Sequence, residues 1–303
     1  MQELNTYQGV LCMNKPQNFT SFDVIGKLRW ILHMKKLGHT GTLDPMATGV
    51  LPILVGRAAR ACDMLPDENK TYRAEVQFGI TTDTEDIWGK QTAAFPDMYV
   101  TEEALKAVLP RFLGKILQIP PMYSAISIGG KRLYTLARQG IEVERPARQV
   151  RVDAIQLEAF DEAAQTAQLS ISCGKGTYIR TLLADIGIAL GGGAVMTSLY
   201  RTAACGFILR DCYDFAQVET FCKAGTLQAH LIPTDHLFLM YPVLHLSVQQ
   251  AQQYRNGVKL PLGQLTEAFP HQDLYRVYGS QEEFLGVGFA NRETELFQVR
   301  KNF

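Results

Sequence analysis

A glycine-rich segment between residues 38 and 49 contains the strongest candidate for a reactive side chain, Asp44. It is the only acidic residue between Asp23 and Asp63, and Pro45 biases it away from helical geometry. A carboxylate presented by such a loop can act as a nucleophile or as a base. A lone loop aspartate is more often a turn residue that bonds its own backbone. The segment taken alone favours that simpler interpretation.

Arg180 gives Asp44 a physical partner. Glycines at 176 and at 191–193 delimit a predicted helix from about residue 177 to 190, which places Arg180 in its first turn. A cation there opposes the helix dipole by a few tenths to about 1 kcal/mol, so we expect an anion close by. Asp44 or an RNA phosphate would serve, and pairing with arginine favours the ionised carboxylate. The alternative is a surface arginine without a partner.

Three rings near these segments allow two interpretations. Tyr72 and Tyr178 stand at the start of a predicted strand and helix, where most tyrosines are core residues, and His39 is an ordinary loop position. The other interpretation is that all three stack on RNA, because enzymes that act on a base hold it against aromatic side chains.

Cofactor and metal chemistry find little support. The six cysteines form no Cys-x-x-Cys pair, and His33 and His39 lack ligand spacing. Gly174-Lys175-Gly176-Thr177 resembles the end of a phosphate-binding loop, but position 169 is Leu where that motif needs Gly. We expect no cofactor and no metal. A catalytic thiol has no support either.

Charge is distributed unevenly along a chain that is neutral overall. Among 303 residues, 30 basic residues balance 30 acidic ones, yet residues 11–60 carry an excess of five positive charges and residues 111–151 an excess of six. Such blocks can form a basic face for nucleic acid, or they can be unrelated solvated surfaces. No apolar run could cross a bilayer and the N-terminus lacks a signal-peptide pattern, so we expect a cytoplasmic protein.

The elements that must position these residues indicate an α+β fold. Thr20 or Ser21 can begin a helix whose apolar positions are Phe22, Ile25, Leu28 and Leu32. Residues 72–80 alternate like a strand, 150–160 and 167–173 like an antiparallel pair, and 215–223 like a helix. Residues 118–151, rich in Pro, Gly and basic residues, predict an extended excursion with one short helix near 134–139. After a boundary near 241–247, a small β-rich module follows. We expect a mixed, mainly antiparallel central sheet.

The sequence resembles the bacterial tRNA pseudouridine synthase B family over roughly residues 9 to 240. The strongest block is Gly38-His39-Thr40-Gly41-Thr42-Leu43-Asp44-Pro45-Met46-Ala47-Thr48-Gly49-Val50-Leu51-Pro52. The other blocks follow in the family's order: Asn14-Lys15-Pro16, Thr20-Ser21-Phe22-Asp23-Val24, Lys70-Thr71-Tyr72-Arg73, Thr82-Asp83-Thr84, Gln118-Ile119-Pro120-Pro121-Met122-Tyr123-Ser124-Ala125, Gly130-Lys131-Arg132-Leu133-Tyr134, Ala137-Arg138-Gln139-Gly140-Ile141 and Gly174-Lys175-Gly176-Thr177-Tyr178-Ile179-Arg180.

This resemblance implies a pseudouridine synthase fold in residues 1–245 and a PUA-like module in 246–303. It implies an enzyme that flips the T-loop uridine-55 out of the tRNA T-arm stem-loop, breaks its glycosidic bond, rotates the ring and makes a carbon–carbon bond. Asp44 matches the family's essential aspartate, which attacks either the base or the sugar. The other implied roles are catalytic for Tyr72 and Arg180, and substrate-binding for Lys15, His39, Tyr72, Tyr178 and Leu199. Residues 124–151 resemble the family's RNA-closing thumb. We expect the protein to be a monomer.

Three departures from the family pattern bear on these roles. Asn18 replaces a common Gly, and Asn tolerates the left-handed backbone that such a turn needs. Tyr200-Arg201 replaces a common pair of arginines, which removes one potential RNA contact. Residues 266–303 carry four basic and six acidic residues, which argues against strong phosphate binding there. Two other functions stay open: an RNA-binding protein that folds tRNA without modifying it, and a synthase acting on another RNA.

Overall fold

The computed structural model describes residues 7–66, 68–265 and 274–303. Its main feature is a nine-stranded sheet with the order β1-β3-β12-β4-β11-β10-β7, in which β2 also pairs with β3 and β13 with β12. The β12–β3 pairing is parallel and the other pairings of this sheet are antiparallel. The α+β class and the mixed, mainly antiparallel sheet are therefore confirmed.

The strands of this sheet follow the alternation expected of half-buried strands. In β4 every second side chain from Lys70 to Phe78 is buried, so one face packs on the core and the other faces outward. The strands are β1 (Gly9–Lys15), β2 (Leu37–His39), β3 (Thr48–Val55), β4 (Lys70–Phe78), β7 (Gly114–Gln118), β10 (Arg148–Asp161), β11 (Thr166–Cys173), β12 (Ala194–Ala204) and β13 (Phe207–Ile208). A separate hairpin pairs β5 (Ile80–Thr82) with β6 (Gln91–Ala94).

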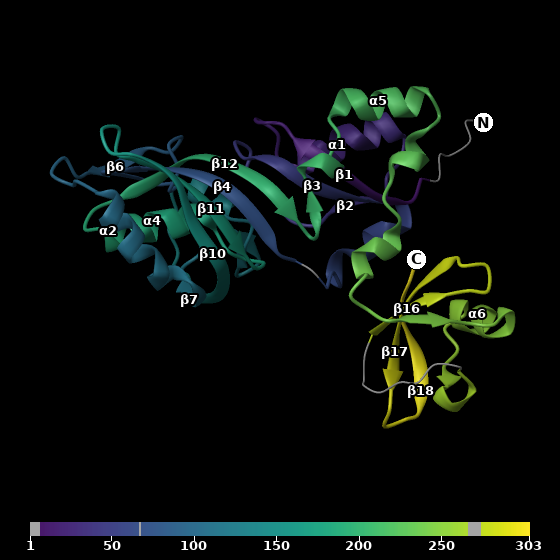
Figure 1. Cartoon of the computed structure of the whole chain (residues 1–303). Helices are drawn as coiled ribbons and strands as arrows, with labels where there is room; N and C mark the ends of the chain where they lie inside the picture. Colours follow the sequence, from purple (N-terminus) through teal and green to yellow (C-terminus); the bar gives the residue numbers. More distant parts are fainter. Residues whose placement is uncertain (1–6, 67, 266–273) are drawn as a thin grey trace.

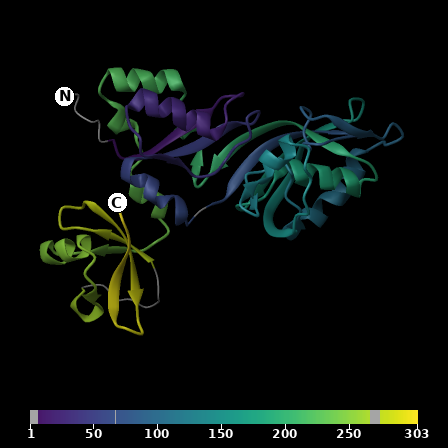
Figure 2. The same ribbon diagram turned by 180° about the vertical axis from the view of Figure 1, so that it is seen from behind.

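Helices cover the sheet at its two ends, and each end has its own core (Figure 1). Helices α2 (Glu102–Val108) and α4 (Ile179–Ala189) share one core with β4, β10, β11 and β12, and α4 packs mainly on β12. Helices α1 (Ser21–Leu32) and α5 (Phe215–Lys223) lie side by side at the opposite end, near β1 and β3, as Figure 2 shows from behind. Short 3-10 helices connect these elements: η1 (Gly56–Asp63), η2 (Leu109–Phe112), η3 (Leu209–Asp211), η4 (Leu227–His230) and η5 (Thr234–Phe238).

Helix α1 begins where the sequence predicts, with Thr20 as its cap, but one of its expected core positions is wrong. Thr20 accepts a hydrogen bond from the backbone of Asp23, and Asp23 accepts one in return, which forms a capping box. The buried side includes Ile25, Leu28 and Leu32 as predicted. Phe22, predicted to share this apolar side, is instead 67% exposed, because it lies on the helix face that points away from the sheet.

Residues 124–147, which we call the thumb, extend from the end of the sheet as the predicted excursion. They contain the hairpin β8 (Ser127–Ile128) with β9 (Lys131–Arg132) and the predicted short helix, α3 (Leu133–Arg138). Residues 148–151, which we expected in this excursion, instead begin β10, because their backbone pairs with β7. The thumb is therefore shorter than the sequence pattern predicts.

A second sheet of five strands forms the C-terminal module, in the order β14-β16-β17-β18-β15. The expected division at 245/246 falls at the end of its first strand. Its elements are β14 (Val243–His245), α6 (Val248–Arg255), β15 (Leu260–Pro261), η6 (Leu262–Gln264), β16 (Leu274–Tyr278), β17 (Phe284–Asn291) and β18 (Leu296–Asn302). Glu267 and Asp273, two of the six acids counted there, and the N-terminal residues 1–5 lie outside the described residues.

The module docks on the first domain through apolar and ionic contacts. The Phe238 ring lies 5.5 Å from that of Phe303 and 6.2 Å from that of Phe284. The Lys301 ammonium contacts the Asp63 carboxylate at 2.8 Å. Lys301 is thus engaged within the chain, whereas a phosphate-binding role would need it free.

Candidate active site

The segment that carries Asp44 is held against the start of α1. The Ser21 hydroxyl, which is buried, accepts a hydrogen bond of 2.8 Å from the Leu43 backbone N–H. The Asn18 N–H donates to the Pro45 carbonyl at 2.9 Å. Asn18 has φ +65°, so the left-handed turn expected at this departure from the family pattern is confirmed. Both residues beside Asp44 are therefore fixed by backbone hydrogen bonds.

Arg201 is fully buried in β12 and holds the segment that carries Asp44 through hydrogen bonds. Its guanidinium donates to the carbonyls of Val50 at 2.7 Å, Gly41 at 3.2 Å and Thr42 at 3.4 Å. Gly49 allows the backbone of β12 to lie close to the segment. It has φ +103°, and a Cβ there would lie 2.2 Å from the Arg201 carbonyl oxygen. Sequence reasoning weighed position 200 and missed this role of Arg201. The available signal was an arginine in an otherwise apolar strand pattern.

Lys15 also acts as a support for the segment. Its ammonium donates to the carbonyls of Phe19 at 2.6 Å, Pro16 at 2.9 Å and Pro45 at 3.2 Å, which engages all three of its N–H donors. Burial lowers the pKa of Lys15 to about 8. In this geometry Lys15 supports Pro45, next to Asp44. The substrate contact expected of Lys15 stays a prediction.

Arg180 and Asp44 form the expected ion pair, in a two-pronged geometry. Arg180 Nε lies 2.9 Å from one Asp44 carboxylate oxygen, and a terminal nitrogen lies 3.4 Å from the other. The remaining donors reach the carbonyls of Thr84 at 2.7 Å and Tyr123 at 3.0 Å. The arginine side chain is 5% exposed and that of Asp44 is 37% exposed. A buried cation thus orients a carboxylate that stays accessible.

Tyr72 and Leu199 form the apolar side of the site. Both are buried in one core cluster with Leu43, the residue before Asp44. Burial raises the pKa of Tyr72 to about 12; the Asp44 charge adds to this effect, and the Arg201 charge opposes it. The phenol is therefore protonated near neutral pH, and its ring offers an apolar surface close to the carboxylate.

Tyr178 is fixed at the start of α4 by Gln118, a buried residue at the end of β7. The Gln118 amide accepts from the Tyr178 N–H at 2.8 Å and donates to its carbonyl at 3.0 Å. Burial raises the pKa of Tyr178, and the Asp44 charge acts in the same direction. Gln118 belongs to one of the recognised blocks, but sequence reasoning gave it no role. It joins the base of the thumb to the helix that carries Arg180.

His39 ends β2 and precedes the segment that carries Asp44. Burial, and then the charge of Arg201, lower the pKa of His39, so its ring is neutral near pH 7. Within the described part of the chain, His39 Nδ1 and Thr40 Oγ1 are buried and find no hydrogen-bond partner. Buried polar atoms without partners are uncommon in folded proteins.

The loop between β5 and β6 encloses Arg180 from the other side, and sequence reasoning gave it no role. Thr181, next to Arg180, donates to the Glu85 carboxylate at 2.5 Å. Asp86 lies 3.8 Å from an Arg180 terminal nitrogen. Burial raises the pKa of both carboxyls, Glu85 and Asp86. The recognised block Thr82-Asp83-Thr84 was the sequence feature that could have indicated a role for this loop.

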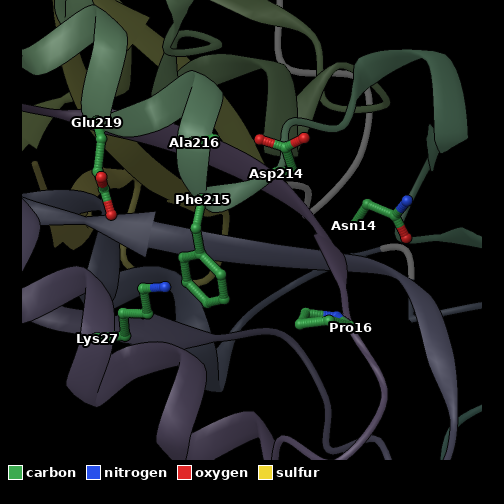
Figure 3. A pocket seen from close by; sticks show the side chains of 7 residues that line it. All are labelled: Asn14, Pro16, Lys27, Asp214, Phe215, Ala216 and Glu219. Carbon is green, nitrogen blue, oxygen red and sulfur yellow. The ribbon is translucent and has the colours of Figure 1, made fainter.

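In the described ranges, no group of three or more His, Cys, Asp or Glu side chains could hold a metal ion. In the same ranges, no helix is long and apolar enough to span a membrane. A cavity of about 330 Å³ opens between α1 and α5, with Asn14, Lys27 and Phe215 in its lining (Figure 3). It contains none of the predicted site residues. The chemistry indicated by the geometry therefore belongs to Asp44 and its surroundings.

Solved structures share this architecture. A Cbf5-Nop10-Gar1 complex superposes with a TM-score of 0.74 at 24% identity, over 99% of this chain and 86% of that chain. An H/ACA RNP bound to a substrate RNA containing 2′-deoxyuridine gives a TM-score of 0.73 at 22% identity, over 97% and 84%. These likenesses show that the chain has the same fold as those proteins.

The chain belongs to the TruB family of pseudouridylate synthases. The model of the TruB family pseudouridylate synthase N-terminal domain matches residues 29–179, and that of the pseudouridine synthase II TruB C-terminal region matches residues 242–297. A tRNA pseudouridine synthase B from Acaryochloris marina is 43% identical, covering 92% of this chain and 94% of that protein. One from Chromobacterium violaceum is 41% identical, covering 96% and 94%.

Proposed function

We propose that this enzyme converts the T-loop uridine-55 of tRNA to pseudouridine. The observation that carries the proposal is the two-pronged contact between Arg180 and Asp44, which aims one accessible carboxylate into a site walled by Tyr72, Tyr178 and Leu199. The curated relatives are named as synthases that act on tRNA.

The reaction needs a base that has left its helical stack. Flipping the uridine brings its ring against the Tyr72 face, where stacking offsets the lost base stacking. Asp44 then attacks the base or the sugar, the C–N glycosidic bond breaks, and the ring rotates. A carbon–carbon bond then forms to C5 and the bond between Asp44 and the substrate breaks, which frees the carboxylate. C5 loses its proton, while N1 gains one. Atoms and electrons balance within the substrate, so the conversion is an isomerisation. Arg180 keeps the carboxylate oriented through these steps.

The remaining parts have supporting roles in this proposal. Residues 1–245 form the catalytic unit, the thumb closes on the T-arm, and residues 246–303 form the small module. The protein acts as a monomer in the cytoplasm, where tRNA is processed. Two further possibilities give different outcomes in the test: a tRNA-folding protein that modifies nothing, and a synthase for another RNA.

The decisive experiment compares wild type with Asp44→Asn and Asp44→Ala on a T-arm hairpin and on whole tRNA, and maps pseudouridine by position. We expect both variants to bind RNA and to lose at least about 10³-fold in rate, because a nucleophile or base has been removed. Product from Asp44→Ala at the wild-type rate would contradict the proposal. Wild type that binds tRNA but modifies no RNA favours the folding function. Modification confined to another RNA changes the substrate.

A further inference from the structure

Helix α1 presents two large aromatic side chains to the outside. Phe22 is 67% exposed and Trp30 is 72% exposed. With Gly26, Arg29 and His33, which are also exposed, they follow the i, i+4, i+7, i+8, i+11 spacing of one helical face. We call these five residues the α1 face. Exposed aromatic residues that gather on one face are typical of an interaction surface.

Gly26 lies at the centre of this face, and the fold gives no reason for a glycine there. A Cβ added at Gly26 would meet nothing within 4 Å, and the residue has helical backbone geometry. A glycine inside a helix is less favourable than alanine or glutamine. Glycine does allow another molecule's backbone to approach closely. Phe22 and Trp30, four residues to either side, would flank such an approach.

The charge around the face is positive. Between Asp23 and Asp44 the chain has no acidic residue, while Lys27, Arg29, Lys35 and Lys36 are basic. Asp23 is occupied in the helix cap. The Arg29 guanidinium lies 5.8 Å from the Phe22 ring centre. On the opposite flank, Lys27 lies over the Phe215 ring of α5 at 4.2 Å, as Figure 3 shows. Aromatic rings interleaved with cations are the recognised surface for unpaired nucleotides.

The position of α1 connects this face to the Asp44 site at both ends. Ser21, its first residue, holds Leu43 next to Asp44. The helix spans about 18 Å at 1.5 Å per residue. Beyond His33 the chain returns through Lys35 and Lys36 to β2 and His39. The helix that carries the α1 face is therefore joined at both ends to segments of the Asp44 site.

We propose that the α1 face binds unpaired nucleotides of the substrate RNA outside the target uridine's own pocket. Bases stack on Phe22 and Trp30, and the sugar–phosphate backbone crosses the helix at Gly26, where Arg29 neutralises phosphate charge. This surface is additional to Asp44, Tyr72 and the thumb. The identity of the RNA rests on the proposed function, whereas the binding surface does not.

Direct contact can be measured because the chain has only two tryptophans. In a Trp88→Phe background, the fluorescence reports Trp30 alone, and we expect tRNA to quench it. Phe22→Ala and Trp30→Ala should each weaken tRNA binding about tenfold, as expected for one lost base stack. The rate constant at saturating RNA should not change. Met240→Ala, which removes a 65% exposed apolar side chain elsewhere, is the matched control and should bind as wild type.

Gly26→Gln separates binding from folding. The space around Gly26 is open, and glutamine favours helix more than glycine does. We therefore expect the variant to have a higher melting temperature than wild type. We also expect several-fold weaker tRNA binding and a raised KM, since a side chain now blocks the approach. Wild-type tRNA affinity in both Trp30→Ala and Gly26→Gln would overturn the inference. Unchanged RNA affinity with an altered sedimentation coefficient would assign the face to a second copy of this chain, which also overturns it.

These outcomes differ from a failure of the proposed function. If wild type binds tRNA without making pseudouridine, the proposed reaction fails, and affinity loss in the α1 variants still supports the surface. If wild type is active and the α1 variants are indistinguishable from it in KM and in affinity, the reaction stands and the surface fails. Both measurements use the full chain.

Discussion

The segment that carries Asp44 and the thumb are held in opposite ways. Residues 41–50 rest on two buried cations, Arg201 and Lys15, whose donors reach backbone carbonyls. The thumb is mostly exposed, and its strands are two residues long. It joins the body beside Gln118, which bonds Tyr178, and Tyr123, which bonds Arg180.

The difference shows how one chain can combine a fixed carboxylate with a surface able to adapt. Backbone carbonyls bound by a buried guanidinium cannot shift without losing several hydrogen bonds at once, so the position of Asp44 is set before substrate arrives. The thumb has few buried side chains, chiefly Leu133 and Leu136, and so little free energy opposes its movement. Both regions meet at Arg180.

Arg201→Met tests the fixed region and should have the largest effect. Methionine fills similar volume but leaves the carbonyls of Val50, Gly41 and Thr42 without this donor. We expect the free energy of unfolding to fall by about 2–4 kcal/mol, measured by urea denaturation. Arg255→Met, at a surface ion pair with Glu283, should change it by less than about 1 kcal/mol. If both variants lost the same free energy of unfolding, the buried Arg201 would stabilise the fold no more than a surface arginine does.

Arg180→Lys tests the point where the two regions meet. Lysine keeps the charge but loses the fork that contacts both Asp44 oxygens. We expect the rate constant at saturating RNA to fall about 100-fold, as for a misplaced reactive group, with RNA affinity within about twofold. Arg73→Lys, at an exposed arginine of β4, should leave both unchanged. An equal loss of rate and affinity would indicate that Arg180 contacts phosphate.

Asp185→Asn tests the effect of a carboxylate that is partly buried in α4. Burial raises the pKa of Asp185 to about 6, so between about pH 4 and 6 the folded state binds more protons than the unfolded state. The free energy of unfolding therefore falls as pH rises through that window. The variant should be more stable than wild type by about 1–2 kcal/mol at pH 7 and equal to it near pH 4, as measured by thermal unfolding. The Asp185 charge also raises the pKa of Glu85, so the variant removes that effect as well. A constant difference across pH would contradict this origin.

Lys131→Ala probes the thumb and should have the smallest effect on stability. Lys131 is exposed in β9, so its removal should change the free energy of unfolding by less than about 0.5 kcal/mol. If it contacts phosphate, the slope of log Kd against log salt should decrease in magnitude by about 1. Lys106→Ala, at an exposed lysine of α2 paired with Glu102, should leave the slope unchanged. A large loss of stability would show that the thumb is part of the fixed body.

Local elements were predicted well because their signals are local. Thr20 caps α1, helix α5 spans the predicted residues 215–223, and Asn18 adopts the left-handed turn. The prediction of which side chains are buried was less accurate. Phe22 fits the apolar spacing of α1, yet it lies outside, because spacing identifies apolar positions and not which of them face the sheet.

By itself the sequence determined which carboxylate is the candidate reactive group, the helix start at Arg180 and the family blocks. Only the tertiary structure decided what Arg201, Lys15 and Gln118 do. Asp44 and Arg180 are 136 residues apart, and Arg201 is 151 from Val50. Such contacts depend on how β3, β12 and α4 pack together. A buried cation satisfied by distant carbonyls leaves no periodic pattern in the chain, so its role appears only when the strands that supply those carbonyls are in place.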